Sequence, residues 1–491
     1  MNNPILLNPA SHNQRRRSIS ATNRDGSISE YYDSLFMAII GICGFLQILP
    51  HGWLGVSMLL IVSIRLYRKI DHAITMLELA ALIMVMQCII GPLLMYHSDF
   101  NHYRYMMYVN SNTYFQFVIP AVATFIMALF YPIKGLRHLS LDISKGKNLQ
   151  TLGFYLLGIG VLGSLGTFVP GMQFFFYLVA QFKYVGAICL FICGHRYKWL
   201  VLTCVLLSSY ASSAEQGMFG ELFFWGCFIV TFILLHFRRS HALKISLFTG
   251  GTLVLLTLQG VKGEYREAID EGRDTSLASL LSETFWSLGS VYENDDFRHV
   301  ALTRLNQGWI ISKTMRHVPE EEPFANGSTI KDAVYSSLVP RFLDNNKTKS
   351  GGRESFLRYT GLYIMSDTTM CIGLLGEAYV NYGVKGGIVV MIILGVFFNR
   401  IFALFIGLGK YNSYFILCLP LIFLQAVKPE TDFVTVVNHL TKASLIVFMV
   451  YLALPKLLGS LKIKRKTKDI VHAIHAKKQR RPLRAGTQTS S

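Results

Sequence analysis

The sequence predicts an all-α integral membrane protein with about twelve transmembrane helices and a large helical cap loop on the outer side of the membrane. Hydrophobic residues make up 52% of the 491 residues, charged residues only 15%, and the mean hydropathy is +0.39, whereas roughly a quarter of an ordinary soluble domain is charged. Twelve apolar runs approach the ~20 residues that a helix needs to cross a bilayer. Lysine and arginine gather at every second connection, as in cytoplasmic loops. These observations exclude a soluble protein.

The chain begins with a polar segment, and nine of the apolar runs follow it. Residues 1–33 contain Arg15, Arg16 and Arg17 among many serines and asparagines, which predicts a disordered cytoplasmic tail without a cleavable signal. Residues 34–260 are expected to hold transmembrane helices 1–9, at 34–50, 52–67, 76–96, 114–133, 151–169, 171–193, 199–213, 218–237 and 245–260.

A long loop interrupts the apolar runs at residues 261–369. Residues 261–367 carry 13 basic and 16 acidic side chains, a net charge of −3, and their apolar residues follow a helical spacing, which predicts a folded cap. Residues 370–458 are expected to form re-entrant or transmembrane helices 10–12, with runs at 384–406, 411–427 and 440–458. The tail 459–491 carries ten basic residues and one acid, about half of the chain's excess of +18, so both termini are predicted to be cytoplasmic.

Few ionisable residues lie within the apolar runs, and they are scattered. Glu78, Lys183 and Glu221 are the clearest cases. A charge within a membrane is costly in free energy, which leaves two interpretations of each residue. Its side chain either faces a cavity, or it pairs with a neighbouring residue or extends to the membrane interface. Both interpretations stay open for each residue, but the three do not form the series of acids expected of a proton relay.

Arg304 is the first candidate for binding an anionic ligand. A helix over 297–315 would place Phe297, Val300, Ala301, Gly308, Ile311 and Met315 on one apolar face, with Arg304 in its middle. A buried unpaired charge costs several kcal/mol. Arg304 must therefore meet either a carboxylate of the protein, such as Asp295 or Asp296, or an anionic group of a ligand.

A second basic group follows in the same loop. Residues 341–358 contain five basic residues and two acidic ones, a net charge of +3. The basic residues are Arg341, Lys347, Lys349, Arg353 and Arg358, and the acidic ones are Asp344 and Glu354. The guanidinium fork matches phosphate oxygens bidentately, so two arginine groups on the outer face would suit a diphosphate at the lipid headgroup level. The alternative is a solvated charged face. Arg353 and Arg358 are five residues apart, so a loop or a helix end would have to bring them together.

No sequence pattern indicates a metal or a cofactor. The chain lacks GxxxxGK[ST], HExxH and GxGxxG motifs. All eight cysteines lie within or beside apolar runs, where a free thiol behaves as a small hydrophobe. The acidic segment 293–296 could cradle a metal but is expected to be an ordinary polar turn. We therefore expect no metal site, no cofactor and no nucleic-acid partner.

Four short segments carry a resemblance to a known family. They are TRLNQG at 303–308, PFANG at 323–327, SLVPRFL at 337–343 and GLLGEAYVNYG at 373–383. In this order they resemble the Wzy-type oligosaccharide repeat-unit polymerases, or O-antigen polymerases, of bacterial surface polysaccharides. The likeness covers about 80 residues, and the family layout of about a dozen spans with a late outward loop and cytoplasmic termini agrees with the predicted topology.

The resemblance implies a metal-independent membrane glycosyltransferase of the bacterial inner membrane, with a periplasmic catalytic loop. It would transfer a growing glycan from polyprenyl (undecaprenyl) diphosphate onto a lipid-linked repeat unit, in O-antigen or exopolysaccharide biosynthesis. Expected partners are lipid-linked repeat units, membrane lipids, a chain-length regulator and a flippase. The catalytic residues implied are Arg304, Arg341 and Glu377, and the substrate-binding residues are Lys347, Arg353, Arg358 and Tyr379.

Three alternatives accompany this interpretation. Glu377, in Gly376-Glu377-Ala378-Tyr379 before the apolar run near Val384, could be an acid–base or acceptor-orienting group, or could instead neutralise the start of a helix. An O-antigen ligase would differ from a polymerase only in its acceptor. A transporter or flippase for a lipid-linked or anionic solute is the main alternative from another class, although the chain lacks the internal repeats typical of transporters.

Overall fold

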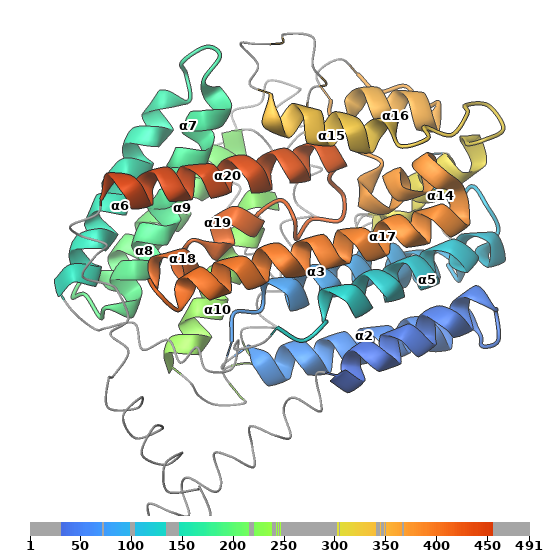
Figure 1. Ribbon diagram of the computed structural model, residues 1–491, viewed down its shortest axis with the longest axis horizontal. Coiled ribbons are helices and arrows are strands. Elements are labelled where there is room, and N and C mark those ends of the chain that lie inside the picture. Colours follow the sequence, from blue (N-terminus) through green and yellow to red (C-terminus); the bar gives the residue numbers. More distant parts are fainter. Residues whose placement is uncertain are drawn as a thin grey trace, which may run out of the picture.

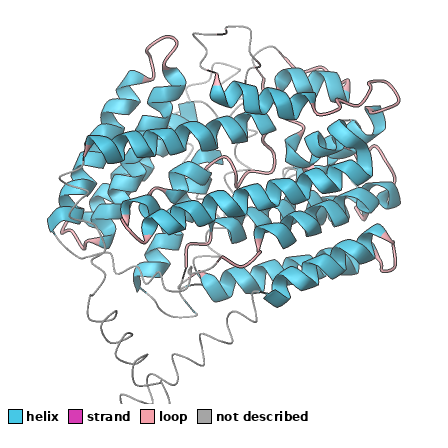
Figure 2. Ribbon diagram, viewed as in Figure 1, coloured by secondary structure: helices cyan, strands magenta, loops and turns pink. Residues whose placement is uncertain are grey.

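The computed structural model describes residues 31–70, 73–98, 104–133, 147–215, 220–237, 305–339, 350–365 and 368–454, with a few single positions between these ranges. In these ranges the secondary structure is helical and no strand occurs (Figure 2). The expectation of an all-α protein is therefore confirmed for the described part of the chain.

The helices of the first half are Tyr31–Phe45, α2 (His51–Lys69), α3 (Met76–Val85), the π-helix η1 (Met86–Ile90), α4 (Gly91–Tyr96), α5 (Ser111–Leu129), α6 (Lys147–Gly166), α7 (Gln173–Ala180), α8 (Phe182–Ile192), α9 (Lys198–Glu215) and α10 (Gly220–Phe237). The second half contains α14 (Gly308–His317), α15 (Ser328–Leu338), α16 (Arg353–Thr360), α17 (Gly373–Gly409), α18 (Tyr414–Leu417), α19 (Leu419–Phe423) and α20 (Phe433–Ala453).

Six helices of the described ranges are long and apolar enough to cross a membrane. They are Met76–Tyr96, Ser111–Leu129, Asn148–Gly166, Gln173–Ile192, Gly373–Gly409 and Phe433–Ala453, and Tyr31–Phe45 and Gly220–His236 are shorter apolar helices. The chain is thus a multi-pass helical membrane protein. Most of the predicted span at 245–260 lies outside the described residues.

The apolar run 411–427 does not form one long helix. α18 ends at Leu417, α19 ends at Phe423, and irregular backbone follows up to Asp432. Pro420 stands in the first turn of α19, where its missing N–H leaves no bond unmade, but it cannot continue a helix from α18. Residues 424–432 are referred to below as the interhelix segment.

The start of the chain also differs from expectation. Tyr31–Asp33, predicted as the end of a disordered tail, are the first residues of a helix, and Asp33 is buried. Its carboxylate forms ion pairs with Arg65 and Arg68 of α2, which explains why a polar residue is held against the bundle. The remaining residues of both predicted tails lie outside the described ranges.

The close packing of α5 against α17 forms the centre of the fold (Figure 1). A Cβ atom at Gly395 would lie 2.5 Å from the carbonyl oxygen of Phe125, so glycine is needed for the two backbones to approach. Nearby, the buried amide of Asn399 donates to the carbonyl oxygens of Leu129 and Tyr131, at 3.0 and 2.9 Å. These bonds satisfy two carbonyls where α5 ends.

The helices α14, α15 and α16, which belong to the loop predicted as a cap, gather at the end of the bundle where α17 and α20 begin (Figure 1). The predicted continuous helix 297–315 is wrong in one respect: Asn306 and Gln307 are not helical, and α14 begins at Gly308. The cause is tertiary, because the backbone at 305–306 lies against Gly91 and the Gln307 N–H donates to the carbonyl oxygen of Gln87, at 3.1 Å. Residues 261–301 lie outside the described ranges.

We expect Gly395→Ala to destabilise the α5–α17 interface by about 1–3 kcal/mol, the usual cost of overpacking. Gly407→Ala is the matched control in the same helix, because a Cβ atom there would meet nothing within 4 Å. Thermal unfolding of the purified protein in detergent measures both. An unchanged midpoint for Gly395→Ala would show that α5 and α17 do not approach this closely.

Candidate functional site

Glu377 is a buried carboxylate where α17 meets the start of α20. Its residue is 1% exposed. Oε1 accepts a hydrogen bond from the backbone N–H of Phe433, the first residue of α20, at 3.3 Å. The second oxygen, Oε2, is buried and receives no hydrogen bond of normal geometry from the described residues. The carboxylate therefore caps the N-terminus of α20 through Oε1, and the Thr329 hydroxyl is a further donor beside it.

A break in α17 separates the Glu377 segment from the rest of the helix. Tyr382 and Gly383 leave the helical conformation, and Gly383 adopts φ 65° and ψ −158°, a region that is essentially restricted to glycine. Gly373–Asn381 is thus a short helix of its own, and the apolar run begins after it at Val384. This position agrees with the predicted place of Glu377 before that run.

Asn381 joins two of the segments that carry the family resemblance. Its side chain is fully buried, and its Oδ1 accepts from the N–H of Gly327 at 2.9 Å. Its Nδ2 donates to the Thr329 hydroxyl and to the carbonyl oxygen of Glu377, both at 2.8 Å. One side chain therefore fixes the PFANG segment and the start of α15 to the helix that bears Glu377.

Backbone and aromatic contacts strengthen this junction. The N–H of Ala325 donates to the carbonyl oxygen of Val380 at 2.9 Å. Tyr379 is buried, its hydroxyl donates to the carbonyl oxygen of Val318 at 3.2 Å, and its ring packs edge-on against Phe324 and Phe117. Tyr379, predicted to bind substrate, therefore has a protein partner for its hydroxyl and a place in the core.

The interhelix segment brings three charged residues into the bundle that sequence reasoning missed. Lys428, Glu430 and Asp432 lie on it, and Asp432 caps α20 by accepting from the N–H of Thr435 at 2.7 Å. Burial raises the pKa of Asp432, although hydrogen bonds to its carboxylate oppose the shift. Burial lowers the pKa of Lys428, while Glu221 and Glu430 oppose this. The available signal was the KPETD stretch, which interrupts two apolar runs.

Gln87 and the interhelix segment connect TRLNQG to the Glu377 segment. The backbone carbonyl oxygen of Gln87 accepts a hydrogen bond from the Gln307 N–H, and the side-chain Nε2 of Gln87 donates to Glu430 Oε2 at 2.9 Å. On the same segment, the carbonyl oxygen of Pro429 accepts from the N–H of Leu374 at 3.0 Å. Gln87 lies in the π-helix η1, an element that occurs often at functional sites.

Arg353 and Arg358 lie on the same short helix, α16, and have separate protein partners. Arg353 donates to the carbonyl oxygens of Ile364 and Met365, at 2.8 and 3.3 Å. Arg358 forms an ion pair with Glu322, and this bond raises the pKa of the guanidinium. No loop or helix end brings the two arginines to a common point, so the structure does not assemble them into one anion site.

Three predicted residues lie outside the described ranges: Arg304, Arg341 and Lys347. The described residues on either side of 340–349 meet the start of α20. Val339 follows α15, which packs along α20, and Gly351 donates its N–H to the Thr435 hydroxyl at 3.3 Å. Within the described part of the chain, no group of His, Cys, Asp and Glu residues could hold a metal ion.

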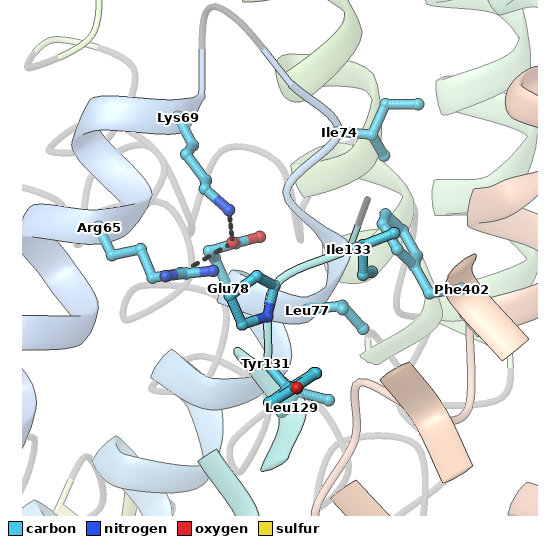
Figure 3. Close-up of a pocket in the computed structure, with 10 residues that line it drawn as sticks. Arg65, Lys69, Ile74, Leu77, Glu78, Leu129, Tyr131, Ile133 and Phe402 are labelled. Atoms are coloured by element: carbon cyan, nitrogen blue, oxygen red, sulfur yellow. Dashed lines mark hydrogen bonds and ion pairs between the residues drawn. The ribbon is translucent and has the colours of Figure 1, made fainter. Parts of the chain in front are cut away.

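The charges noted in the early spans have protein partners. Glu78 Oε1 accepts from Arg65 Nε at 3.1 Å and from Lys69 Nζ at 2.9 Å, beside a small pocket at the end of α2 (Figure 3). Glu221 accepts from the Tyr177 hydroxyl at 2.8 Å and from Gln181 at 2.7 Å. These two glutamates therefore pair with neighbouring residues of the protein, which is one of the two interpretations that the sequence left open.

Comparisons with family models, with curated proteins and with solved structures returned no match.

We expect Asn381→Ala to destabilise the protein by about 1–3 kcal/mol, because it leaves the Gly327 N–H and the Thr329 hydroxyl buried without their partner. Thermal unfolding in detergent measures this loss. Asn112→Ala removes a hydrogen bond between exposed His51 and Asn112 side chains and should change stability by less than about 0.5 kcal/mol. Equal stability of the two variants would contradict the role assigned to Asn381.

Proposed function

We propose that this protein is a membrane glycosyltransferase of the polysaccharide-polymerase type. It transfers a growing glycan from a polyprenyl diphosphate carrier onto a lipid-linked oligosaccharide repeat unit. The reaction takes place at the outer face of the bacterial cytoplasmic membrane. In this proposal twelve spans place the cap in the periplasm and both termini in the cytoplasm.

One observation supports the proposal above the others. The segments TRLNQG, PFANG and GLLGEAYVNYG resemble the polymerases, and they are distant in sequence. PFANG is joined to GLLGEAYVNYG directly, by the bond from the Gly327 N–H to Asn381. TRLNQG is joined to GLLGEAYVNYG indirectly: Gln307 bonds to Gln87, Gln87 bonds to the interhelix segment, and that segment bonds to Leu374. A common site would require this convergence, and Glu377 lies within it.

The proposed chemistry is a displacement at the anomeric carbon of the donor sugar. The acceptor hydroxyl forms the new C–O bond, its proton passes to the Glu377 carboxylate, and the bond to the diphosphate breaks. Polyprenyl diphosphate leaves with the bonding electron pair. Arg304 and Arg341 stabilise the charge that gathers on the leaving group, and Lys347 holds the headgroup.

Two other functions remain candidates. A ligase of the O-antigen type would use the same donor and site with a different acceptor. A transporter or flippase of a lipid-linked or anionic solute is favoured by one specific observation, the charged interhelix segment inside the bundle, since irregular backbone at membrane depth normally lines a cavity or is buried in protein.

Reconstitution in liposomes with lipid-linked repeat units separates these functions. A polymerase lengthens the glycan on the carrier when substrate is supplied on the cap side. A ligase transfers the glycan only when a lipid-core acceptor is present. Movement of the lipid-linked substrate across the bilayer without lengthening would contradict the glycosyltransferase assignment.

We expect Glu377→Gln to reduce polymer formation by at least about a hundredfold, the scale of losing a general base. Glutamine retains an oxygen that can accept the Phe433 N–H, so the variant should insert at normal abundance. Polymer length and membrane abundance are measured together on the same cells. Normal polymer at normal abundance would remove Glu377 from the chemistry and leave it as a helix cap.

Arg304→Ala and Arg341→Ala should each abolish polymer while the protein still inserts. Arg304→Lys and Arg341→Lys should restore little activity, because an ammonium group cannot reproduce the bidentate guanidinium fork. Arg68→Ala serves as a control, since Arg68 lies on α2 in the Asp33 ion pair. Full-length polymer from both alanine variants at normal expression would reject the donor-binding role.

A further inference from the structure

The cap helix α15 has its polar and apolar faces in the reverse of the arrangement expected in water. Its buried residues are small and mostly polar: Thr329, Ala333, Ser336 and Ser337. In the second half of α15 the exposed residues are apolar or aromatic, Val334 at 48%, Tyr335 at 46% and Leu338 at 68%, whereas the charged Lys331 and Asp332 are exposed in its first half. A helix on a water-exposed surface buries its apolar stripe and exposes its polar one. The outward face of α15 is therefore poorly suited to water.

The position of α15 explains this reversal. α15 packs along α20 (Figure 1), one of the helices long and apolar enough to cross a membrane. Its first turn is held at the end of the bundle by Asn381, which accepts from the Gly327 N–H and donates to the Thr329 hydroxyl. The charged pair Lys331 and Asp332 lies near that end, whereas the apolar residues follow in the second half. Polarity thus decreases along the helix as it runs beside α20.

Tyr335 fits a boundary between headgroups and hydrocarbon. Its ring is exposed, while its hydroxyl donates to Asp344 Oδ2 at 3.0 Å. Tyrosines at membrane interfaces combine an apolar ring with a satisfied polar end in this way. Leu338, three residues further along, is the most exposed of the apolar residues and has no such polar end.

We propose that the outward face of α15, formed by Val334, Tyr335 and Leu338, contacts lipid acyl chains. α15 then lies within one leaflet beside α20, and its buried face of small residues points toward the bundle. If the proposed function holds, a lipid-linked substrate reaches Glu377 past this helix without leaving the bilayer. The lipid contact itself does not depend on that function.

Tryptophan fluorescence in nanodiscs tests the lipid contact without measuring activity. Leu338→Trp places an indole at the end of the proposed lipid face, and Tyr335→Trp is a second variant at a separate position. Glu320→Trp is the control, because Glu320 is exposed in the turn after α14. Each spectrum is corrected by subtracting that of the unmodified protein, and each variant must show normal membrane abundance and elution.

We expect nanodiscs of dibrominated phospholipid to remove most of the fluorescence that Leu338→Trp adds, and aqueous iodide to leave it unchanged. Glu320→Trp should respond in the opposite way. Quenching of the Leu338→Trp signal by iodide would show a water-facing helix and overturn the proposal. Quenching by neither reagent would show that another segment of this chain or a second copy covers the face, and would overturn it as well.

Discussion

The arrangement of the candidate site depends on the hydrogen bonds of one buried amide, that of Asn381. Its oxygen accepts a hydrogen bond from the Gly327 N–H, and its nitrogen donates to the Thr329 hydroxyl and to the carbonyl oxygen of Glu377. A side-chain amide has two N–H donors and an acceptor oxygen, so this one side chain can join all three groups. Because these groups are out of water, each lost bond would leave an unsatisfied polar atom.

Around this amide, the structure uses interrupted helices to place polar groups inside an apolar bundle. α17 breaks at Tyr382 and Gly383, and the interhelix segment replaces what would otherwise be a span between α18 and α20. The helix starts near these interruptions also have backbone groups that need partners: the Leu374 N–H, at the start of α17, donates to the carbonyl oxygen of Pro429, and the Phe433 N–H, at the start of α20, donates to the Glu377 carboxylate. The carboxylate is thereby held in place through Oε1.

The polar residues of the bundle fall into two kinds with different consequences. Arg65 and Lys69 of α2 neutralise Glu78, whereas Glu221 accepts hydrogen bonds from the uncharged side chains of Tyr177 and Gln181. Glu377 differs, because within the described ranges it accepts one bond of normal geometry, 3.3 Å from the Phe433 N–H, and has the Thr329 hydroxyl as a neighbouring donor, with no cation bonded to it. Burial of a carboxylate with so few partners is costly, and such residues are found where a fold keeps a group ready for a ligand or a proton.

The sequence alone determined that this is a helical membrane protein, because span-length apolar runs and a low charge content leave no other solution for the backbone. It also located Glu377 ahead of an apolar run, since that depends only on local order along the chain. It could not show that Asn381 joins residues 52 and 54 positions away, or that Asp432 is buried while Lys428 and Glu430 are half-buried. Those features depend on contacts between distant segments, and so did the break at Asn306, where packing against Gly91 overrides a helical pattern.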